Sequence, residues 1–147
     1  MVVRVILTSD VKKYRKAARA LIKGKDRVLE IGCASGKTTK IVAEIAEKVV
    51  AVDKSALEVN RARERLKDFT NVVIEVRDAT EVNEVKKLIN DHLNGRVDVV
   101  MIDLGGVAEP GEVLSLTRRY SFAFKPKLCI VKNRLLIDFI KSCEIYQ

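Results

Sequence analysis

The chain has 147 residues, of which 48% are apolar and 33% are charged, and its net charge is +8. This length suits one domain with a substantial core, so we treat residues 1–147 as a single domain. No apolar run reaches 18 residues, which excludes a membrane-spanning helix, and the apolar start is too short for a signal peptide. The 3 cysteines have no metal-type spacing, so we expect no metal site and a reduced, cytoplasmic protein.

Apolar patterns of two kinds alternate along the chain. Short apolar runs predict strands, and apolar residues at every third or fourth position predict amphipathic helices. The expected strands lie within 1–10, 28–31, 48–53, 71–80, 96–106 and 127–133, with 143–147 as a candidate for a final strand. The expected helices are 10–23, 37–47, 55–69, 81–92, 111–120 and 134–142. Strands that alternate with helices of this length indicate crossover connections and a parallel sheet.

The most informative segment is VLEIGCASGKTTK, residues 28–40, in which a strand runs into a tight turn and then a helix. Small residues in such a turn let a ligand approach the backbone, and the helix start offers free N–H groups to an anion. Glu30, at the end of the strand, offers the opposite charge. A ligand that carries both a carboxylate and an ammonium would suit this pair, and the alternative is an ordinary turn without a ligand.

Spacing excludes two phosphate-binding motifs at this turn. A P-loop needs four residues between its first Gly and its Gly-Lys-Ser/Thr, whereas three residues separate Gly32 from Gly36. The dinucleotide fingerprint needs Gly at its first, third and sixth positions, which here are Gly32, Ala34 and Lys37. The remaining candidate is S-adenosylmethionine (SAM), whose methionine end is a zwitterion.

Carboxylates also follow the next three expected strands. Asp53 comes 23 residues after Glu30, a position from which an acid can accept hydrogen bonds from both hydroxyls of a ribose. The alternative for Asp53 is a helix cap, but Ser55 already begins a capping box for the next helix. Asp78 follows the third strand, where Thr80 would cap the next helix if Asp78 is only a turn residue. Asp103 ends the fourth strand.

These strand ends together resemble the class I SAM-dependent methyltransferases. Residues 28–40 are similar to motif I of that family, with Ala34 at the usual middle glycine, as in some 2′-O-ribose RNA methyltransferases. The resemblance implies an α/β, Rossmann-like fold: a doubly wound, mostly parallel sheet with helices on both faces, shortened at its C-terminal edge. It also implies SAM as the cofactor, bound by Glu30, Gly32, Cys33, Ala34, Gly36, Lys37, Asp53, Lys54, Asp78, Ala79 and Asp103.

The resemblance assigns roles to several of these residues. Asp78 would accept a hydrogen bond from the adenine amino group, and the backbone of Ala79 would contact the ring. Cys33 would be a small neighbour of the ligand rather than a nucleophile, because no His or second Cys lies near it in the sequence to activate it. The family places residues that bind the methyl acceptor around Asp103.

The 2′-O-ribose RNA methyltransferases remove the proton of the acceptor hydroxyl with a Lys-Asp-Lys-Glu set. Asp103 would match the Asp and Lys132 the second Lys, and in this hypothesis Asp103 holds Lys132 while a lysine takes the proton. The first Lys would be Lys12 or Lys13, and the Glu could be Glu144, which follows Lys132 by only 12 residues. The alternative for Lys132 is a solvent-facing strand end. The Asn/Asp-Pro-Pro-aromatic motif of the amine methylators does not follow the fourth strand.

The positive charge is concentrated at the two ends of the chain. Residues 1–40 hold 11 Lys or Arg and 3 Asp or Glu, and residues 118–147 hold 7 and 2, whereas the middle has 10 basic and 15 acidic residues. The expected first helix carries basic residues at helical spacing: Lys12, Lys16 or Arg15, Arg19 and Lys23. A basic rim near the site suits a phosphate backbone, and the alternative is a solvated helix face. The Lys- and Glu-rich composition also resembles that of thermophile proteins.

Three functions therefore stay open from the sequence. The first is an RNA methyltransferase that binds RNA through the basic N-terminal helix and the C-terminal segment. The second is a methyltransferase for a small molecule or a protein. The third is a SAM- or RNA-binding module without catalysis, because a full class I domain ends in a strand hairpin and this chain has room for a stub. A second copy or a partner protein would then complete the edge of the sheet.

Overall fold

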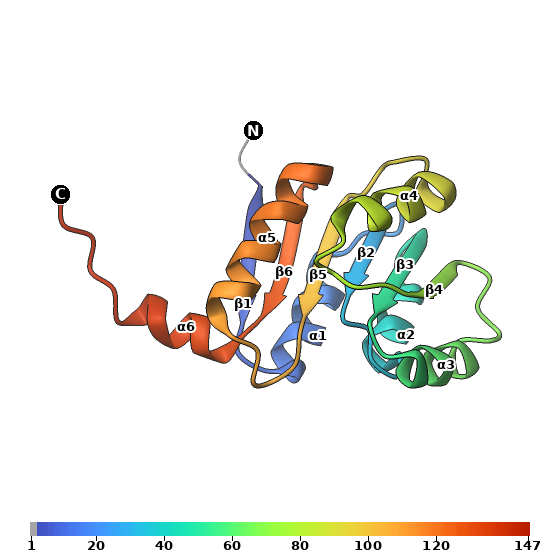
Figure 1. Cartoon of the computed structure of the whole chain (residues 1–147), viewed down its shortest axis with the longest axis horizontal. Coiled ribbons are helices and arrows are strands. Elements are labelled where there is room, and N and C mark those ends of the chain that lie inside the picture. Colours follow the sequence, from blue (N-terminus) through green and yellow to red (C-terminus); the bar gives the residue numbers. More distant parts are fainter. Residues whose placement is uncertain (1–2) are drawn as a thin grey trace.

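A computed structural model describes residues 3–147 as one parallel sheet with helices on both faces (Figure 1). The strands are β1 (Arg4–Thr8), β2 (Arg27–Ile31), β3 (Lys48–Asp53), β4 (Val72–Val76), β5 (Val99–Asp103) and β6 (Leu128–Lys132). The helices are α1 (Val11–Leu21), α2 (Lys37–Ala43), α3 (Ala56–Arg65), α4 (Val82–Leu93), α5 (Pro110–Phe124) and α6 (Arg134–Lys141). The Rossmann-like α/β fold predicted from the sequence is confirmed; residues 1 and 2 of the expected first strand lie outside the described residues.

The six strands follow the order β1-β6-β5-β2-β3-β4, and every neighbouring pair is parallel. The chain winds from β2 through β3 to β4 in one direction, and β5 and β6 continue on the other side of β2. The order therefore reverses between β2 and β5, and open α/β sheets bind their ligands beside such a switch point, at the carboxyl ends of the strands.

The expectation of a final strand at 143–147 is wrong. These residues are exposed and form no strand, and in Figure 1 they extend away from the sheet beyond α6. The place beside β6 is taken instead by β1, which pairs along Arg4–Thr8 with Leu128–Lys132. Thr8 secures this contact, because its Oγ1 donates to Val131 O at 3.0 Å and its carbonyl accepts from Asn133 N at 2.9 Å. The edge of β6 is thus covered by the chain's own N-terminal strand.

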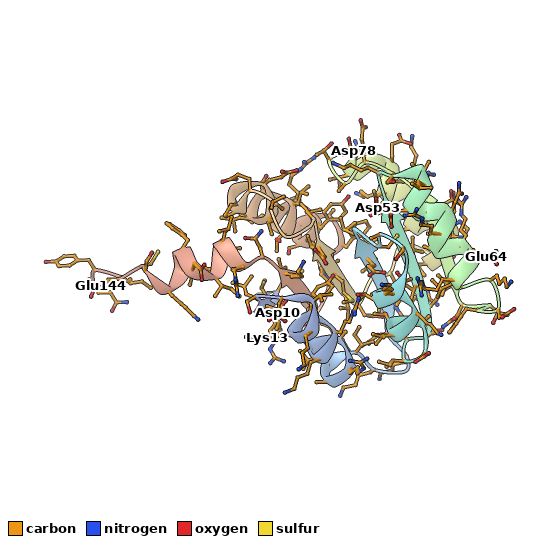
Figure 2. The ribbon with its side chains drawn as sticks, turned by 90° about the horizontal axis from the view of Figure 1, so that it is seen from below. Asp10, Lys13, Asp53, Glu64, Asp78 and Glu144 are labelled. Carbon is orange, nitrogen blue, oxygen red and sulfur yellow. The ribbon has the colours of Figure 1, made fainter. Side chains whose placement is uncertain are left out.

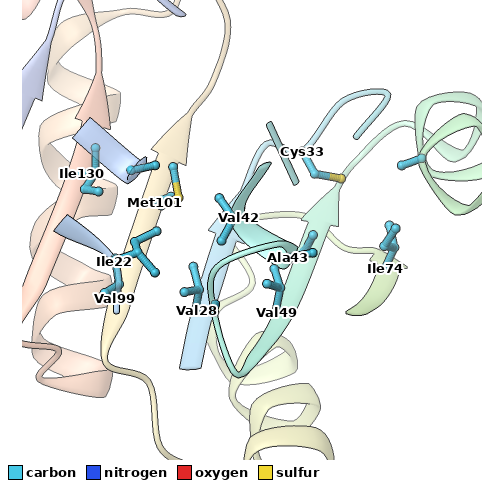
Figure 3. Packing of buried hydrophobic residues seen from close by; sticks show 14 of the residues in the cluster. Ile22, Val28, Cys33, Val42, Ala43, Val49, Ile74, Val99, Met101 and Ile130 are labelled. Carbon is cyan, nitrogen blue, oxygen red and sulfur yellow. The ribbon is translucent and has the colours of Figure 1, made fainter. Parts of the chain in front are cut away.

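Two apolar clusters fill the spaces on either side of the sheet. Alternate strand residues point to opposite faces. Val28, Val49 and Val99 belong to the cluster that includes residues of α1, α2 and α3. Figure 3 shows Val28 and Val49 near Val42 and Ala43 of α2, and Val99 near Ile22. The immediate neighbours of the three strand valines, Leu29, Val50 and Val100, pack on the other face against α4 and α5. Both faces are buried, which explains why the strands are nearly continuous apolar runs.

Local hydrogen bonds set where the helices begin and end. Asp10, Ser55 and Asn133 each cap a helix by accepting from a backbone N–H three residues later, at 2.7–3.2 Å. Helix α2 ends at Ala43, four residues earlier than expected, because Asn71 Nδ2 donates to Ala43 O and Ala46 O and so satisfies its last turn. Within residues 3–147, no helix is both long and apolar enough to span a membrane.

Candidate active site

The carboxyl ends of β2 to β6 surround a cleft of about 810 Å³ at the switch point. Its lining comes from the turn after β2, the ends of β3 and β4, the loop after β5 and the end of β6. Five residues that the sequence predicted for the cofactor site lie together in this cleft, although they come from different strands and turns. They are Gly32, Asp53, Asp78, Ala79 and Asp103. Ala34 and Lys54 line the same cleft.

The turn after β2 is shaped by residues with positive φ. Gly32 has φ +84°, and a Cβ at this position would lie 1.8 Å from the carbonyl oxygen of Asp103. The turn therefore passes directly against the end of β5, and a side chain at position 32 would block that contact. Gly36, with φ +85°, faces Ala62 of α3 and lines neither cavity of the site, so its contribution is to the shape of the turn.

Asp53 connects the turn after β2 with the loop after β3. Its Oδ2 accepts a hydrogen bond from Ala34 N and its Oδ1 accepts one from Ser55 N, both at 2.9 Å. A carboxylate oxygen can accept more than one hydrogen bond. The half-buried carboxylate of Asp53 is therefore fixed in orientation and keeps acceptor capacity towards the cleft. This is the position from which it was predicted to bind a ribose.

Glu30 lies deeper, beside a second cavity of about 200 Å³ that extends from the turn towards α1. The carboxyl group is buried, and Thr39 Oγ1 donates to its Oε1. The pKa of Glu30 is raised to about 7, chiefly by burial; the hydrogen bond from Thr39 opposes this shift, the charges of Asp103 and Asp53 add to it, and the charge of Arg15 opposes it. Glu30 is consequently poised to ionise when a cation enters this cavity.

Asp78 and Ala79 form the wall of the cleft at the end of β4. Asp78 Oδ1 accepts from both Thr80 N and Thr80 Oγ1, and these bonds lower the pKa of Asp78. The turn contact considered as the alternative is thus present, and it uses one oxygen of an exposed carboxylate that still lines the cleft. Tyr120 Oη donates to Ala79 O at 2.7 Å and holds this wall against α5.

Asp103 and Lys132 face each other across β5 and β6, where the strand register pairs them. Lys132 Nζ lies 3.1 Å from Asp103 Oδ1, and the same oxygen accepts from Gly105 N at 3.0 Å. Their side chains are 15% and 19% exposed, so the ion pair is largely buried but open to the cleft. A substrate at the centre of the cleft would therefore contact a carboxylate and an ammonium together.

Other predicted residues lie at different distances from the cleft. Cys33 and Lys37 line the smaller cavity, and burial raises the pKa of the Cys33 thiol, which disfavours the thiolate. Lys12, Lys13 and Glu144 line neither cavity. Lys13 Nζ donates to Ser9 Oγ instead, and Figure 2 shows Glu144 on the tail, far from Asp53 and Asp78. Of the four residues in the Lys-Asp-Lys-Glu set predicted from the sequence, the structure brings two together, Asp103 and Lys132.

Sequence reasoning missed Tyr14 and Thr39 as site residues. Tyr14 was assigned to the apolar face of the first helix, and it is indeed buried there, but it also lines the smaller cavity beside Glu30. The sequence signal that could have identified Tyr14 as a site residue is its hydroxyl group, because a polar atom is unusual on the apolar face of a helix. A signal for Thr39 is a polar residue nine positions after Glu30 on a helix that packs against the same strand.

Comparison with known proteins identifies the family. The model of the Methyltransferase domain family matches residues 22–135, most of the chain. The chain belongs to this family. The class I SAM-dependent methyltransferase resemblance found in the sequence is therefore confirmed, and SAM is the cofactor that the family uses.

Individual relatives differ in what they methylate. Protein-L-isoaspartate O-methyltransferase from Syntrophus aciditrophicus is 39% identical over 61 residues, which are 40% of this chain and 28% of that protein. An rRNA methylase from Streptococcus thermophilus shares the fold with a TM-score of 0.64 at 12% identity, covering 93% of this chain and 81% of its own. Fibrillarin from Aeropyrum pernix, solved with natively bound SAM, has a TM-score of 0.59 at 23% identity, covering 76% and 50%.

The residues present fit SAM. Asp53 lines the cleft, where its carboxylate could accept from the hydroxyls of a ribose, and the smaller cavity continues from the cleft past Gly32 and Ala34, which line both. The smaller cavity holds a buried carboxyl group, Glu30, and a buried hydroxyl without a partner in the described chain, Tyr14 Oη. An ammonium at this end would meet acceptors that the protein itself leaves free.

Proposed function

We propose that this chain is a methyltransferase that transfers the methyl group of SAM to a hydroxyl oxygen of RNA. The observation that carries this proposal is the Asp103–Lys132 pair, whose Oδ1 and Nζ atoms lie 3.1 Å apart in the lining of the cleft. Membership of the methyltransferase family supports the transfer, and the basic surfaces of the chain support the acceptor.

The chemistry divides between the cofactor and the chain. SAM supplies a methyl group on a sulfonium, which makes that carbon electrophilic without help from the protein. The protein aligns the acceptor oxygen with this carbon, and such positioning is worth up to about 7–11 kcal/mol in ideal intramolecular cases. A hydroxyl is a weak nucleophile until its proton is removed, so an acceptor of this kind needs a proton-accepting group within hydrogen-bond distance.

Asp103 and Lys132 are assigned the proton removal as a unit. Gly105 N and Lys132 Nζ both donate to Asp103 Oδ1, which fixes the carboxylate, and the carboxylate in turn holds Lys132 in place. The proton of the acceptor hydroxyl would pass to this pair, and the oxygen would form its bond to the methyl carbon as the bond from that carbon to the cofactor sulfur breaks and leaves its electron pair on sulfur. An amine acceptor would need other contacts, and the motif that amine methylators carry after this strand is absent from the loop after Asp103.

RNA as the acceptor is supported by charge. The exposed residues Lys12, Lys16, Arg19 and Lys23, which we call the α1 basic stripe, form no ion pair with an acid among the described residues. Helix α1 also borders the smaller cavity through Tyr14 and Arg15. A phosphate backbone lying along α1 would thus pass the mouth of the site.

The test is incubation with labelled SAM and two acceptors, total RNA and an isoaspartyl peptide. We expect label in RNA, recovered after hydrolysis as an O-methylated nucleoside, and none with the Lys132→Gln variant. Label in the peptide alone would replace this proposal by O-methylation of protein L-isoaspartate, the activity named for the relatives with local identity near 40%. SAM binding without label in either acceptor would favour the binding-module alternative.

A further inference from the structure

Tyr14 has an unusual position for a tyrosine in a helix that packs on a sheet. Its side chain is 1% exposed, and its hydroxyl is the one buried side-chain oxygen or nitrogen without a hydrogen-bond partner in residues 3–147. A buried hydroxyl without a partner costs free energy, so a native chain keeps one where something else meets it. The hydroxyl borders the 200 Å³ cavity, together with Glu30 and Asp103.

The carboxyl groups of Glu30 and Asp103 bring negative charge to this cavity, which Arg15 and Lys37 line with positive charge. Burial raises the pKa of Tyr14 well above its ordinary value, and the nearby charges of Glu30 and Asp103 raise it further. The hydroxyl therefore keeps its proton and presents its oxygen as an acceptor beside two further acceptors. Three acceptors around one small cavity match the three N–H donors of an ammonium group.

Arg15, the next residue of α1, lines the same cavity with the opposite charge. Its Nε donates to Thr38 Oγ1 at 3.0 Å, which orients the guanidinium and leaves its other N–H groups free among the described residues. The charge of Arg15 also acts on Glu30, opposing the rise of its pKa, so the two groups lie near each other. A carboxylate beside the ammonium would pair with this guanidinium.

Helix α1 lies outside the part of the chain that the family model matches, which begins at residue 22. We propose that α1 forms the wall of the site around the amino-acid end of the cofactor, with Tyr14 Oη facing the ammonium and Arg15 facing the carboxylate. This inference rests on the proposed function and deepens it. It names the residues that would bind the amino-acid end of the cofactor and would therefore distinguish it from an adenosine compound without that end.

The test compares two ligands by isothermal titration calorimetry. S-adenosylhomocysteine carries the amino-acid end, and 5′-methylthioadenosine lacks it while keeping the adenosine. Tyr14→Phe should weaken S-adenosylhomocysteine by about 10-fold, as for a hydrogen bond to a charged group, and leave 5′-methylthioadenosine within about 2-fold. The melting temperature of the ligand-free variant should stay the same or rise, because a buried hydroxyl without a partner is removed.

Matched variants complete the comparison. Tyr120→Phe removes the hydroxyl that donates to the carbonyl oxygen of Ala79 in the wall of the cleft, and it should lower the affinity for both ligands alike. Arg15→Gln should weaken S-adenosylhomocysteine alone, whereas Arg19→Gln, one turn further along α1 and exposed, should weaken neither.

Equal effects of Tyr14→Phe and Arg15→Gln on both ligands, or no effect on either, would overturn the proposal while leaving the proposed function intact. A wild-type chain that binds neither ligand would overturn both.

Discussion

Lys132 Nζ donates to Asp103 Oδ1 across the ends of the adjacent strands β5 and β6, at 3.1 Å, in a pair that is largely buried and still opens into the cleft. A similar pair lies at the other end of the sheet. There Lys127 Nζ contacts Asp26 Oδ1 at 2.7 Å, outside both cavities of the site. The two pairs share their chemistry and differ in access to the cleft, which makes one a control for the other.

Lys132→Gln should reduce methyl transfer by about 10²–10⁴-fold, because it breaks the Asp103–Lys132 pair that is proposed to take the proton of the acceptor hydroxyl. Binding of S-adenosylhomocysteine should stay within a few-fold, since Lys132 does not line the smaller cavity, where the amino-acid end is proposed to bind. Single-turnover transfer to RNA and calorimetry measure the two effects. Lys127→Gln should leave turnover unchanged, and equal losses in the two variants would remove Lys132 from the chemistry.

Asp53→Ala should weaken both S-adenosylhomocysteine and 5′-methylthioadenosine, because both carry the ribose. The expected loss is about 5- to 150-fold, corresponding to about 1–3 kcal/mol for hydrogen bonds to a charged group. Calorimetry measures it, with Asp68→Ala as the control, since Asp68 is an exposed turn residue that lines neither cavity of the site. Undiminished affinity in Asp53→Ala would show that the ribose binds elsewhere.

Glu30 makes stability depend on pH in a window set by its own pKa. The pKa rises from 4.5 to about 7 on folding, so the folded chain binds this proton more tightly than the unfolded one. The stabilising contribution is therefore complete below pH 4.5 and is lost as pH rises through 7, by up to about 3 kcal/mol. Urea unfolding between pH 5 and 8 should show this decline in the wild type and a smaller one in Glu30→Gln.

The same carboxyl group should make cofactor binding depend on pH in the opposite direction. The groups that face it are Thr39, Arg15, Asp53, Asp103 and the Tyr14 hydroxyl. Below pH 7, the protonated carboxyl cannot attract an ammonium, so affinity for S-adenosylhomocysteine should fall. Affinity for 5′-methylthioadenosine, which has no ammonium, should change less. Parallel pH profiles for the two ligands would contradict this role of Glu30.

Gly32→Ala should unfold the chain or destabilise it by about 4 kcal/mol or more, because the new Cβ would lie 1.8 Å from Asp103 O in a backbone with φ +84°. Gly106→Ala is the matched control, since a Cβ there meets nothing within 4 Å. Its free energy of unfolding should stay within about 1 kcal/mol of the wild type. Equal stability of the two variants in urea would mean that the turn does not pack against β5.

RNA binding through the α1 basic stripe should depend on salt. Each phosphate contact contributes about 0.7 to the slope of log K against log salt for single strands. The double variant Lys12→Gln/Lys16→Gln should lower that slope by about 1.4, whereas Lys86→Gln on α4, also exposed, should leave it unchanged. A slope that falls equally for Lys86→Gln would indicate diffuse attraction by the net charge.

The positions of the acidic residues at the strand ends could be predicted from the sequence, because the pattern that marks the end of each strand is local. Glu30, Asp53 and Asp103 end apolar runs, and parallel strands bring such ends to one edge whatever their order. The order of the strands is not encoded locally, because β1 pairs with β6 across more than 120 residues. The edge of β6, which the sequence interpretation left open, is therefore covered by β1 in the fold. Helix α5 continues to Phe124 because Lys125 ends it in a left-handed conformation, just before Pro126, and the apolar pattern marks no such end.

Tyr14 shows a different limit of sequence reasoning. Its place on the apolar face of α1 follows from the periodicity, and its burial agrees with it. Whether its hydroxyl has a partner depends on the cavity formed by Glu30, Cys33 and Asp103, which come from other elements. Residue type and spacing do not encode that relationship, so this part of the site became visible in the structure alone.

The most direct test of the central claim is a crystal structure of the chain with S-adenosylhomocysteine. We predict the ribose hydroxyls within hydrogen-bond distance of Asp53 and the amino-acid end in the cavity beside Glu30. Clear density for the ligand at another surface, or an empty cleft at saturating ligand with Glu30 and Asp53 as they are now, would contradict the account.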